Sequence, residues 1–162
     1  MIVQSESPDG DISHLTYYGP LFTFVVLSRP RIRYATIAEP YVVVSISDPG
    51  DEDAEIAVSP QCRAILRLQF DDVDPALQSL RGRAPLMMQD ARIILDFVHQ
   101  NTADSGVKTI VCQCSMGISR SAGTAAALSR ILQGEDAFFF AAFSPNQHVY
   151  TTLLEVEQRN AC

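Results

Sequence analysis

The sequence predicts an α/β fold, in which helices flank a central, mostly parallel sheet of four to five strands. One observation is the run YVVVSIS at residues 41–47, which is almost continuously apolar and rich in valine. Such a run is typical of a strand covered on both faces, as the strands of parallel sheets are. A second observation is the order of the predicted elements, β-β-β-α-β-α-α, which suits a sheet with helices packed on it.

Four segments are predicted as strands from their content of β-branched and aromatic residues. They are residues 21–28, 41–47, 64–70 and 107–114. The second strand is expected to end at DPGDED, where proline and glycine indicate a turn, and DDVDP follows the third.

Three segments are predicted as helices: residues 85–100, 119–134 and 146–160. The first carries apolar residues at helical spacing, namely Met87, Ala91, Ile94, Leu95 and Val98. Gly134 is expected at the end of the second helix, where a left-handed residue commonly closes the last turn. Pro145 precedes the expected cap of the third.

The composition predicts one domain that spans residues 1–162. A chain of about 150 residues can bury roughly 68–70% of its unfolded surface, so it needs no metal or disulfide to hold it. The apolar fraction is 47% and the charged fraction 19%, which indicates a compact globular protein. The net charge of −7 argues against a general nucleic-acid-binding surface. Nothing in the sequence predicts an oligomeric state.

The sequence also bears on the compartment. The beginning, MIVQSESPDGD, lacks the basic and then apolar order of a signal peptide. The run PLFTFVVL is far shorter than the roughly 20 residues that span a bilayer, so no membrane contact is expected. The four cysteines are irregularly spaced and form no CxxC pair, which argues against a disulfide framework or a zinc site. We therefore expect a cytoplasmic, reducing setting.

The most informative stretch joins the fourth predicted strand to the next helix through SMGIS, residues 115–119. This layout places several backbone N–H groups around one point and aims a helix N-terminus at it, which makes an anion site. Cys114 is expected at the floor of this site, where the N–H groups and the helix dipole favour the thiolate. Arg120, in the first helical turn, can hold two oxygens of a phosphate with its planar guanidinium.

The stretch CSMGISRS fits the pattern Cys-x5-Arg-Ser/Thr and resembles the phosphate loop of the protein tyrosine phosphatase superfamily. The resemblance is strongest to the small dual-specificity phosphatases, whose loop often reads Gly-x-Ser-Arg-Ser. A second match is SPNQHVYTTLLEVE, which resembles the closing helix of these enzymes, opened by a Pro-Asn pair. The resemblance covers roughly residues 41 to 158. It implies a phosphatase-like sheet with a strand–phosphate loop–helix unit.

The resemblance also implies roles for individual residues. The thiolate of Cys114 attacks phosphorus, Arg120 stabilises the phosphate oxygens, and Ser121 donates to the sulfur as it leaves in the second step. The phosphate loop is expected to comprise Ser115, Met116, Gly117, Ile118, Ser119 and Arg120. We expect no metal and no cofactor.

The family places its general acid, an aspartate, in a loop before the helix that precedes the phosphate loop. LQFDDVDPAL offers three candidates there. We predict Asp72 as the acid, because LQFDD matches the strand that carries it in the family, and Asp71 is the next choice. The alternative is that these acidic residues only solvate a turn before Pro75.

One residue departs from the family pattern. The family has histidine immediately before the nucleophile, where it bonds behind the loop and helps to set the acidity of the thiol. Here the residue is Gln113, which donates and accepts hydrogen bonds but never carries charge. The degree of thiol activation, rather than the fold, is therefore open.

The other cysteines have simpler predicted roles. Cys112 is expected to be a small buried strand residue, with a regulatory disulfide to Cys114 as the alternative. Alternate strand positions are awkwardly spaced for disulfide geometry. Cys62 is a second candidate partner, and Cys162 is expected to be exposed.

Two further clusters have alternative interpretations. The run FFFAAF at residues 138–143 is predicted to be core beneath the last helix, or else an interaction patch. Arg29, Arg31 and Arg33 are predicted to form a solvated edge, or else to attract anionic substrate near the pocket.

The function that the resemblance implies is a cysteine-dependent phosphatase acting on phosphotyrosine, with phosphoserine and phosphothreonine as further candidates. Its partner would be a phosphorylated protein or a small phosphomonoester. The loop lacks the lysines that mark inositol-lipid phosphatases of the superfamily. The first alternative is an inactive or weak module that captures phosphorylated partners, and a thiol-redox protein comes after it.

Overall fold

The computed structural model describes residues 11–103 and 106–161. The expectations about the first ten residues and about Cys162 concern residues outside these ranges. In chain order the elements are a 3-10 turn (Ser13–Leu15), β1 (Thr16–Tyr18), β2 (Thr23–Ser28), α1 (Arg29–Ile32), β3 (Tyr41–Ser47), β4 (Cys62–Gln69), α2 (Met88–Thr102), β5 (Thr109–Cys114), α3 (Arg120–Gln133), α4 (Ala137–Ala142) and α5 (Gln147–Asn160).

The described strands form one sheet in the order β1-β2-β5-β3-β4. β5 runs parallel to both β2 and β3, β4 runs parallel to β3, and only the short β1 is antiparallel to its neighbour. The predicted α/β fold with a mostly parallel sheet of four to five strands is therefore confirmed.

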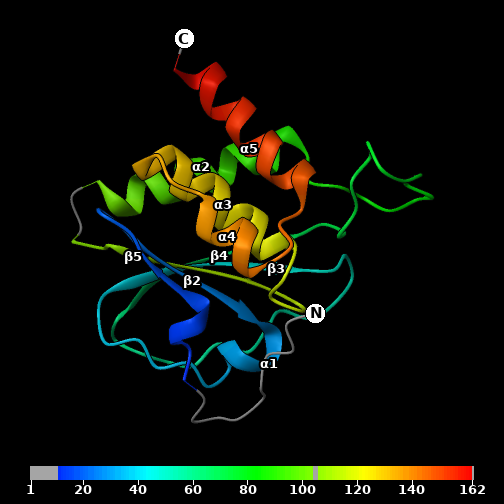
Figure 1. Ribbon diagram of the computed structural model, residues 1–162. Coiled ribbons are helices and arrows are strands. Elements are labelled where there is room, and N and C mark those ends of the chain that lie inside the picture. The colour runs from blue at the N-terminus through cyan, green and yellow to red at the C-terminus, as the bar shows by residue number, and fades with distance from the viewer. Residues whose placement is uncertain (1–10, 104–105, 162) are drawn as a thin grey trace.

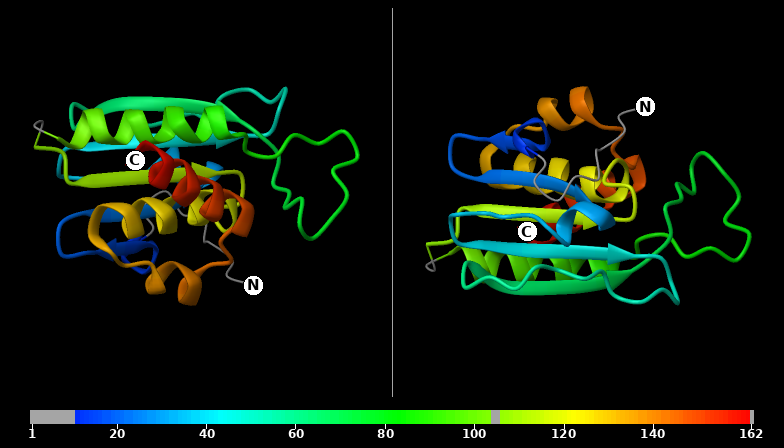
Figure 2. Two further views of the ribbon diagram at one scale, coloured as in Figure 1. Left: turned by 90° about the horizontal axis from the view of Figure 1, so that it is seen from above. Right: turned by 90° about the horizontal axis from the view of Figure 1, so that it is seen from below.

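Helices α2, α3, α4 and α5 lie on one side of this sheet, while α1 lies on the other (Figures 1 and 2). Every residue of β3 and of β5 is buried, as the nearly continuous apolar runs predict for covered strands. β4 lies at the edge of the sheet, and its residues alternate between half-buried and exposed. The carboxyl end of β5 is therefore held in the middle of the sheet, and the predicted phosphate loop begins there.

Most element boundaries differ from the predictions by one to three residues. The helix predicted from residue 85 begins at Met88, because the preceding segment is held in other contacts. Asp71 donates its backbone N–H to the carbonyl of Ala84, and His148 bonds the carbonyl of Leu86. Gly134 ends α3 in the left-handed conformation, as predicted. β1, α1 and α4 are not among the predicted elements, because they span only three to six residues each.

Small residues let α3 pack closely against α5 and against the sheet. Ala122, Gly123 and Thr124 are all fully buried. A Cβ atom built on Gly123 would lie 2.7 Å from the backbone carbonyl oxygen of Asn146. Only glycine at this position therefore allows the start of α5 to approach the first turns of α3, and this approach brings Asn146 beside the phosphate loop.

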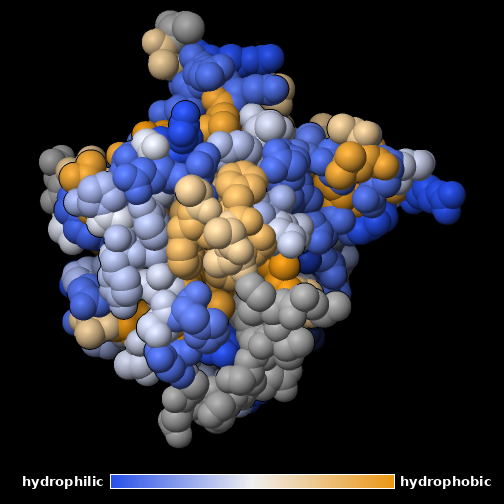
Figure 3. All heavy atoms as spheres, in the orientation of Figure 1, coloured by the Kyte–Doolittle hydropathy of each residue, from blue (hydrophilic) through white to orange (hydrophobic). Residues whose placement is uncertain are grey.

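The run at 138–143 is divided between core and surface. Phe139 is fully buried and meets the rings of Tyr17 and Phe24, while Phe143 is nearly buried. The run thus packs largely on β1 and β2 rather than beneath the last helix, where only Phe140 meets Tyr150. Figure 3 shows apolar side chains gathered on the surface over α4, where Phe140 is 38% exposed.

Candidate active site

The predicted phosphate loop comprises residues 115–120, and its part between β5 and α3, residues 115–119, is held from two sides. The backbone N–H groups of Arg29 and Ser144 donate to the carbonyls of Ser115 (3.1 Å) and Ile118 (3.1 Å). The N–H of Asn146 donates to the carbonyl of Ser119 (3.0 Å). Because C=O and N–H point in opposite directions across a trans peptide, the N–H groups that follow these carbonyls point away from the surrounding chain. An anion cradle needs this orientation.

Cys114 ends β5 beneath this loop and is almost fully buried. Its sulfur lies 3.0 Å from the hydroxyl oxygen of Ser121 and 3.4 Å from the backbone nitrogen of the same residue. Ser121 is itself fully buried in the first turn of α3. A thiolate at Cys114 can therefore accept two hydrogen bonds from one residue.

Arg120 is the first residue of α3, and its side chain is only 5% exposed. Its Nη1 donates to the carbonyl of Phe70 (2.7 Å) and pairs with Oδ1 of Asp48 (2.7 Å), and its Nη2 donates to the hydroxyl of Ser115 (3.3 Å). Its buried Nε has no partner within the described ranges. A buried charged donor without a partner is costly, so Arg120 is prepared to bind an anion.

Sequence reasoning missed Asp48. It follows the last residue of β3, and the sheet order places β3 beside β5. Its side chain is 47% exposed and lies against the guanidinium of Arg120. The carboxyl ends of neighbouring parallel strands lie together at one end of a sheet. An acidic residue directly after a buried strand is therefore the sequence signal that could have identified Asp48.

The structure separates the two candidate acids. Oδ1 of Asp72 accepts from the hydroxyl of Ser119 in the phosphate loop (2.7 Å) and from Nδ2 of Asn146 (2.9 Å). Asp71 instead accepts the backbone N–H of Ala84 (2.7 Å) and closes the base of its own loop. Asp72 thus lies beside the phosphate loop, while the carboxylate of Asp71 is engaged elsewhere.

Asn146 is the second residue that sequence reasoning left without a role. Its Oδ1 accepts the backbone N–H of Val149 and caps α5, while its Nδ2 reaches Asp72 and the carbonyl of Val73. One side chain therefore couples the start of α5 to the loop that carries the candidate acid. The Pro145-Asn146 pair is the sequence signal that could have identified Asn146 as the cap of α5.

A hollow of about 260 Å³ opens between this acid loop, the phosphate loop and the start of α5. Its lining is mostly polar and includes two carboxylates. The lining residues are Asp72, Asp74, Leu77, Gln78, Ser119, Pro145, Asn146 and Gln147. A group attached to a phosphate bound in the loop would find room here.

Gln113 lies on β5, opposite Ser45 of β3, and is fully buried. Its Oε1 accepts the hydroxyl of Ser45 (2.5 Å), and its Nε2 donates to the carbonyl of Cys114 (3.1 Å). The uncharged amide thus bonds the backbone of the candidate nucleophile, and Ser45 fixes its orientation.

The described cysteines are all free thiols. Burial, together with the nearby Cys114, raises the pKa of Cys112 far above its ordinary value, and burial also raises the pKa of Cys62. Both thiols are therefore poor nucleophiles at neutral pH.

The arginine cluster is less solvated than predicted. Arg31 is buried, and Arg29 contributes its backbone N–H to the phosphate loop. Only Arg33 fits the expected edge, where it pairs with Glu55.

Residues 11–103 and 106–161 hold no group of three or more acidic, histidine or cysteine side chains placed to bind a metal ion. The same ranges contain no helix that is both long and apolar enough to cross a bilayer.

No protein-family model and no curated protein matches this chain. Its fold is nevertheless similar to several solved structures. A mouse putative dual specificity phosphatase complexed with zinc tungstate superimposes with a TM-score of 0.56 at 18% identity, over 89% of this chain and 86% of that one. The chain has the fold of the dual-specificity phosphatases.

Two further structures agree with this fold assignment. A variant of human DUSP28 gives a TM-score of 0.56 at 16% identity, over 88% of this chain and 93% of that one. The human tyrosine phosphatase-like serine/threonine/tyrosine-interacting protein gives 0.51 at 19% identity, over 76% of this chain and 80% of that one.

Proposed function

We propose that this protein is a cysteine-dependent phosphatase that hydrolyses phosphotyrosine monoesters, with phosphoserine and phosphothreonine monoesters as further candidate substrates. The observation that carries the proposal is the grouping of Cys114, Arg120 and Ser121 at one loop with Asp72 bonded to its rim. A nucleophile, an anion-binding cation and a carboxylate at one point are what phosphoester cleavage needs.

In the first step the thiolate of Cys114 attacks phosphorus, and the bond between phosphorus and the ester oxygen breaks. Protonated Asp72 gives its proton to the leaving oxygen. Arg120 and the N–H groups of the loop stabilise the phosphoryl oxygens as charge spreads over them.

In the second step water attacks the cysteinyl-phosphate and gives a proton to the carboxylate of Asp72. The sulfur–phosphorus bond breaks, and the hydroxyl of Ser121, 3.0 Å from the sulfur, stabilises the thiolate that is released. Inorganic phosphate leaves, and Cys114 and Asp72 return to their starting protonation states.

The substrate would be a phosphorylated protein or a small phosphomonoester. The hollow beside Asp72 gives a phosphorylated side chain room for the group next to it. Its two carboxylates favour neutral or basic flanking groups over acidic ones.

The experiment is hydrolysis of p-nitrophenyl phosphate across pH by the wild type and by Cys114→Ser. We expect turnover by the wild type and its complete loss in the variant, with folding checked by circular dichroism. A folded wild type without turnover, or equal turnover by Cys114→Ser, would contradict the proposal.

A second candidate function is capture of phosphorylated partners without turnover. The observation that favours it is the similarity of this fold to that of the human tyrosine phosphatase-like serine/threonine/tyrosine-interacting protein. Vanadate or phosphate binding by calorimetry, together with no hydrolysis of the aryl phosphate, would establish this alternative.

A further inference from the structure

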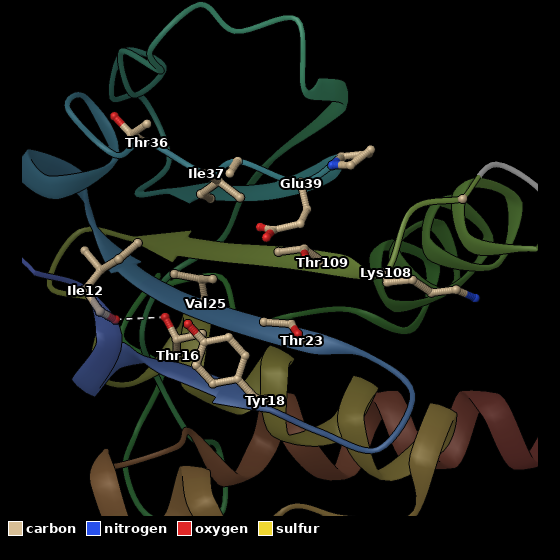
Figure 4. Close-up of a pocket in the computed structure, with 13 residues that line it drawn as sticks. Ile12, Thr16, Tyr18, Thr23, Val25, Thr36, Ile37, Glu39, Lys108 and Thr109 are labelled. Atoms are coloured by element: carbon tan, nitrogen blue, oxygen red, sulfur yellow. Dashed lines mark hydrogen bonds between the residues drawn. The ribbon is translucent and has the colours of Figure 1, made fainter.

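A second cavity, of about 430 Å³, lies at the amino ends of the central strands, and the phosphate loop lies at their carboxyl ends. β2 and β5 both begin at this cavity, with Thr23 and Thr109, and both end near the loop, with Ser28 and Cys114. In Figure 4, Thr36, Ile37 and Glu39 form one wall, Ile12, Thr16 and Tyr18 form the other, and Val25, Thr23 and Thr109 lie between them. A volume of roughly 300–1,000 Å³ is usual for small-molecule sites.

Two hydroxyl groups on the floor of the cavity, those of Thr23 and Thr109, have no partner among the described residues. Thr109 is 5% exposed, yet within residues 11–103 and 106–161 its hydroxyl makes no hydrogen bond, and neither does that of Thr23, its partner in the sheet. Thr16, by contrast, donates to the carbonyl of Ile12. A hydroxyl without a protein partner on a largely buried residue is free to bond a ligand, so a polar ligand group that pairs with Thr109 would be stabilised there.

The charge that faces the cavity is negative. In Figure 4 the carboxylate of Glu39 points into the cavity, toward the strands that carry Val25 and Thr109. Within the described ranges it has no ion-pair partner. Lys108 also borders the cavity, but its ammonium lies 5.1 Å from the centroid of the Phe22 ring and points away from Glu39. The net charge of −7 adds to the attraction for cations.

Most of the remaining lining is apolar. Val25 is almost fully buried, Ile37 lies across from it in Figure 4, and Pro40 also lines the cavity. A ligand that fills the space therefore needs a compact apolar body as well as a charged end.

We propose that this cavity is a second site, which binds a small organic cation: a protonated amine on a compact apolar body. The amine pairs with Glu39 and donates to the hydroxyls of Thr23 and Thr109. The apolar body lies against Val25 and Ile37. This site is independent of the proposed phosphatase activity, because its lining includes none of residues 114–121.

The test uses three probes of nearly the same size and shape that differ in charge: benzylamine, benzyl alcohol and benzoate. Each is titrated at neutral pH into the labelled full-length protein, and amide chemical shifts are followed by NMR. We expect benzylamine to bind at least about tenfold more tightly than benzoate, with shifts centred on residues 16–25, 36–40 and 109. Benzyl alcohol should lie between the two.

Two variants test the named contacts. Glu39→Gln keeps the shape of the side chain and should weaken benzylamine binding about fivefold, with little change for benzyl alcohol. Thr109→Val removes the hydroxyl at nearly constant volume and should weaken it by about threefold or more. Glu55→Gln is the matched control, because this carboxylate pairs with Arg33 outside the cavity, and it should leave binding unchanged.

Three results would overturn the proposal. They are equal affinity for benzylamine and benzoate, unchanged benzylamine affinity in a folded Glu39→Gln, and the absence of shifts at the cavity with any probe. The comparison of probes on the wild type needs no variant to fold.

Discussion

At the scale of single residues, Asp72 has the most sharply defined role to test. Its Oδ1 is held by Ser119 and Asn146, so Oδ2 remains for the proton that goes to the leaving oxygen. Asp72→Asn keeps the shape and removes the proton. We expect kcat to fall by about 10²-fold or more, and the loss to be larger for phenyl phosphate than for p-nitrophenyl phosphate, whose leaving group needs less protonation.

Asp71→Asn is the matched control for this prediction. Asp71 accepts the N–H of Ala84 and, within the described ranges, makes no hydrogen bond to residues 115–120. The amide oxygen of asparagine can accept the same bond, so kcat should stay within about threefold of the wild type. Equal losses in the two variants would remove Asp72 from its assigned role.

Asp48 competes with phosphate for Arg120. The ion pair is 2.7 Å long, and the carboxylate is about half exposed. Asp48→Asn removes the competing charge but keeps a hydrogen-bond acceptor for Nη1. We expect inorganic phosphate to inhibit the variant about fivefold more strongly, corresponding to about 1 kcal/mol for a partly exposed ion pair.

The measurement is the inhibition constant of phosphate at constant pH and ionic strength, with Asp53→Asn as the control. Asp53 pairs with Arg67, which is not part of the phosphate loop, so its loss should leave phosphate inhibition unchanged. Weaker inhibition in Asp48→Asn would mean that Asp48 positions Arg120 rather than competing for it.

At the scale of elements, the contact between α3 and α5 links packing to chemistry. Gly123→Ala would place a Cβ atom 2.7 Å from the carbonyl oxygen of Asn146. The clash is with backbone, so relieving it would require the start of α5 to move. We expect the free energy of unfolding to fall by about 1–3 kcal/mol. Because Asn146 would also move away from Asp72, kcat should fall in the protein that remains folded.

Gly134→Ala separates these two effects. Gly134 is left-handed (φ 77°) at the end of α3, and nothing lies near its Cβ position. Alanine there should cost about 1 kcal/mol of stability through backbone strain alone. Denaturant unfolding and kcat are measured for both variants. Loss of activity in Gly134→Ala, or full activity in Gly123→Ala, would contradict the proposed coupling.

The sequence predicts the elements that local patterns define, but it misses the site residues whose positions depend on strand order or on helix packing. The strand, loop and helix around Cys114 follow from a buried run, small residues and a helix that ends at Gly134. Asp48 acquires its partner only because β3 lies beside β5, an order that no local pattern encodes. Asn146 likewise depends on how closely α5 approaches α3.

At the scale of the whole molecule, the sheet connects two cavities of different chemistry. The phosphate loop at the carboxyl ends of the strands offers N–H groups and Arg120, while the cavity at the amino ends of β2 and β5 offers Glu39 and hydroxyls. β5 spans the distance between them, with Thr109 at one end and Cys114 at the other. The fold thus keeps a proposed anion site and a proposed cation site at opposite ends of one strand.

The net charge of −7 should make the proposed activity depend on salt and on the residues that flank the phosphate. Two carboxylates, Asp72 and Asp74, line the hollow where a flanking residue would lie. We expect kcat/KM for a phosphotyrosine peptide flanked by lysines to exceed that for the glutamate-flanked peptide by about tenfold at about 20 mM salt. The ratio should fall to about threefold or less at about 0.5 M, where the screening length is only a few ångströms.

Asp74→Asn tests whether the preference for lysine-flanked peptides arises from the carboxylates of the hollow or from the net charge of the whole protein. If the hollow contributes, this variant lowers the preference for lysine and leaves p-nitrophenyl phosphate hydrolysis unchanged, because that substrate has no flanking residue. A ratio that stays the same from low to high salt would assign the discrimination to a short, unscreened contact. Equal kcat/KM for the two peptides at low salt would show that neither the hollow nor the net charge selects the substrate.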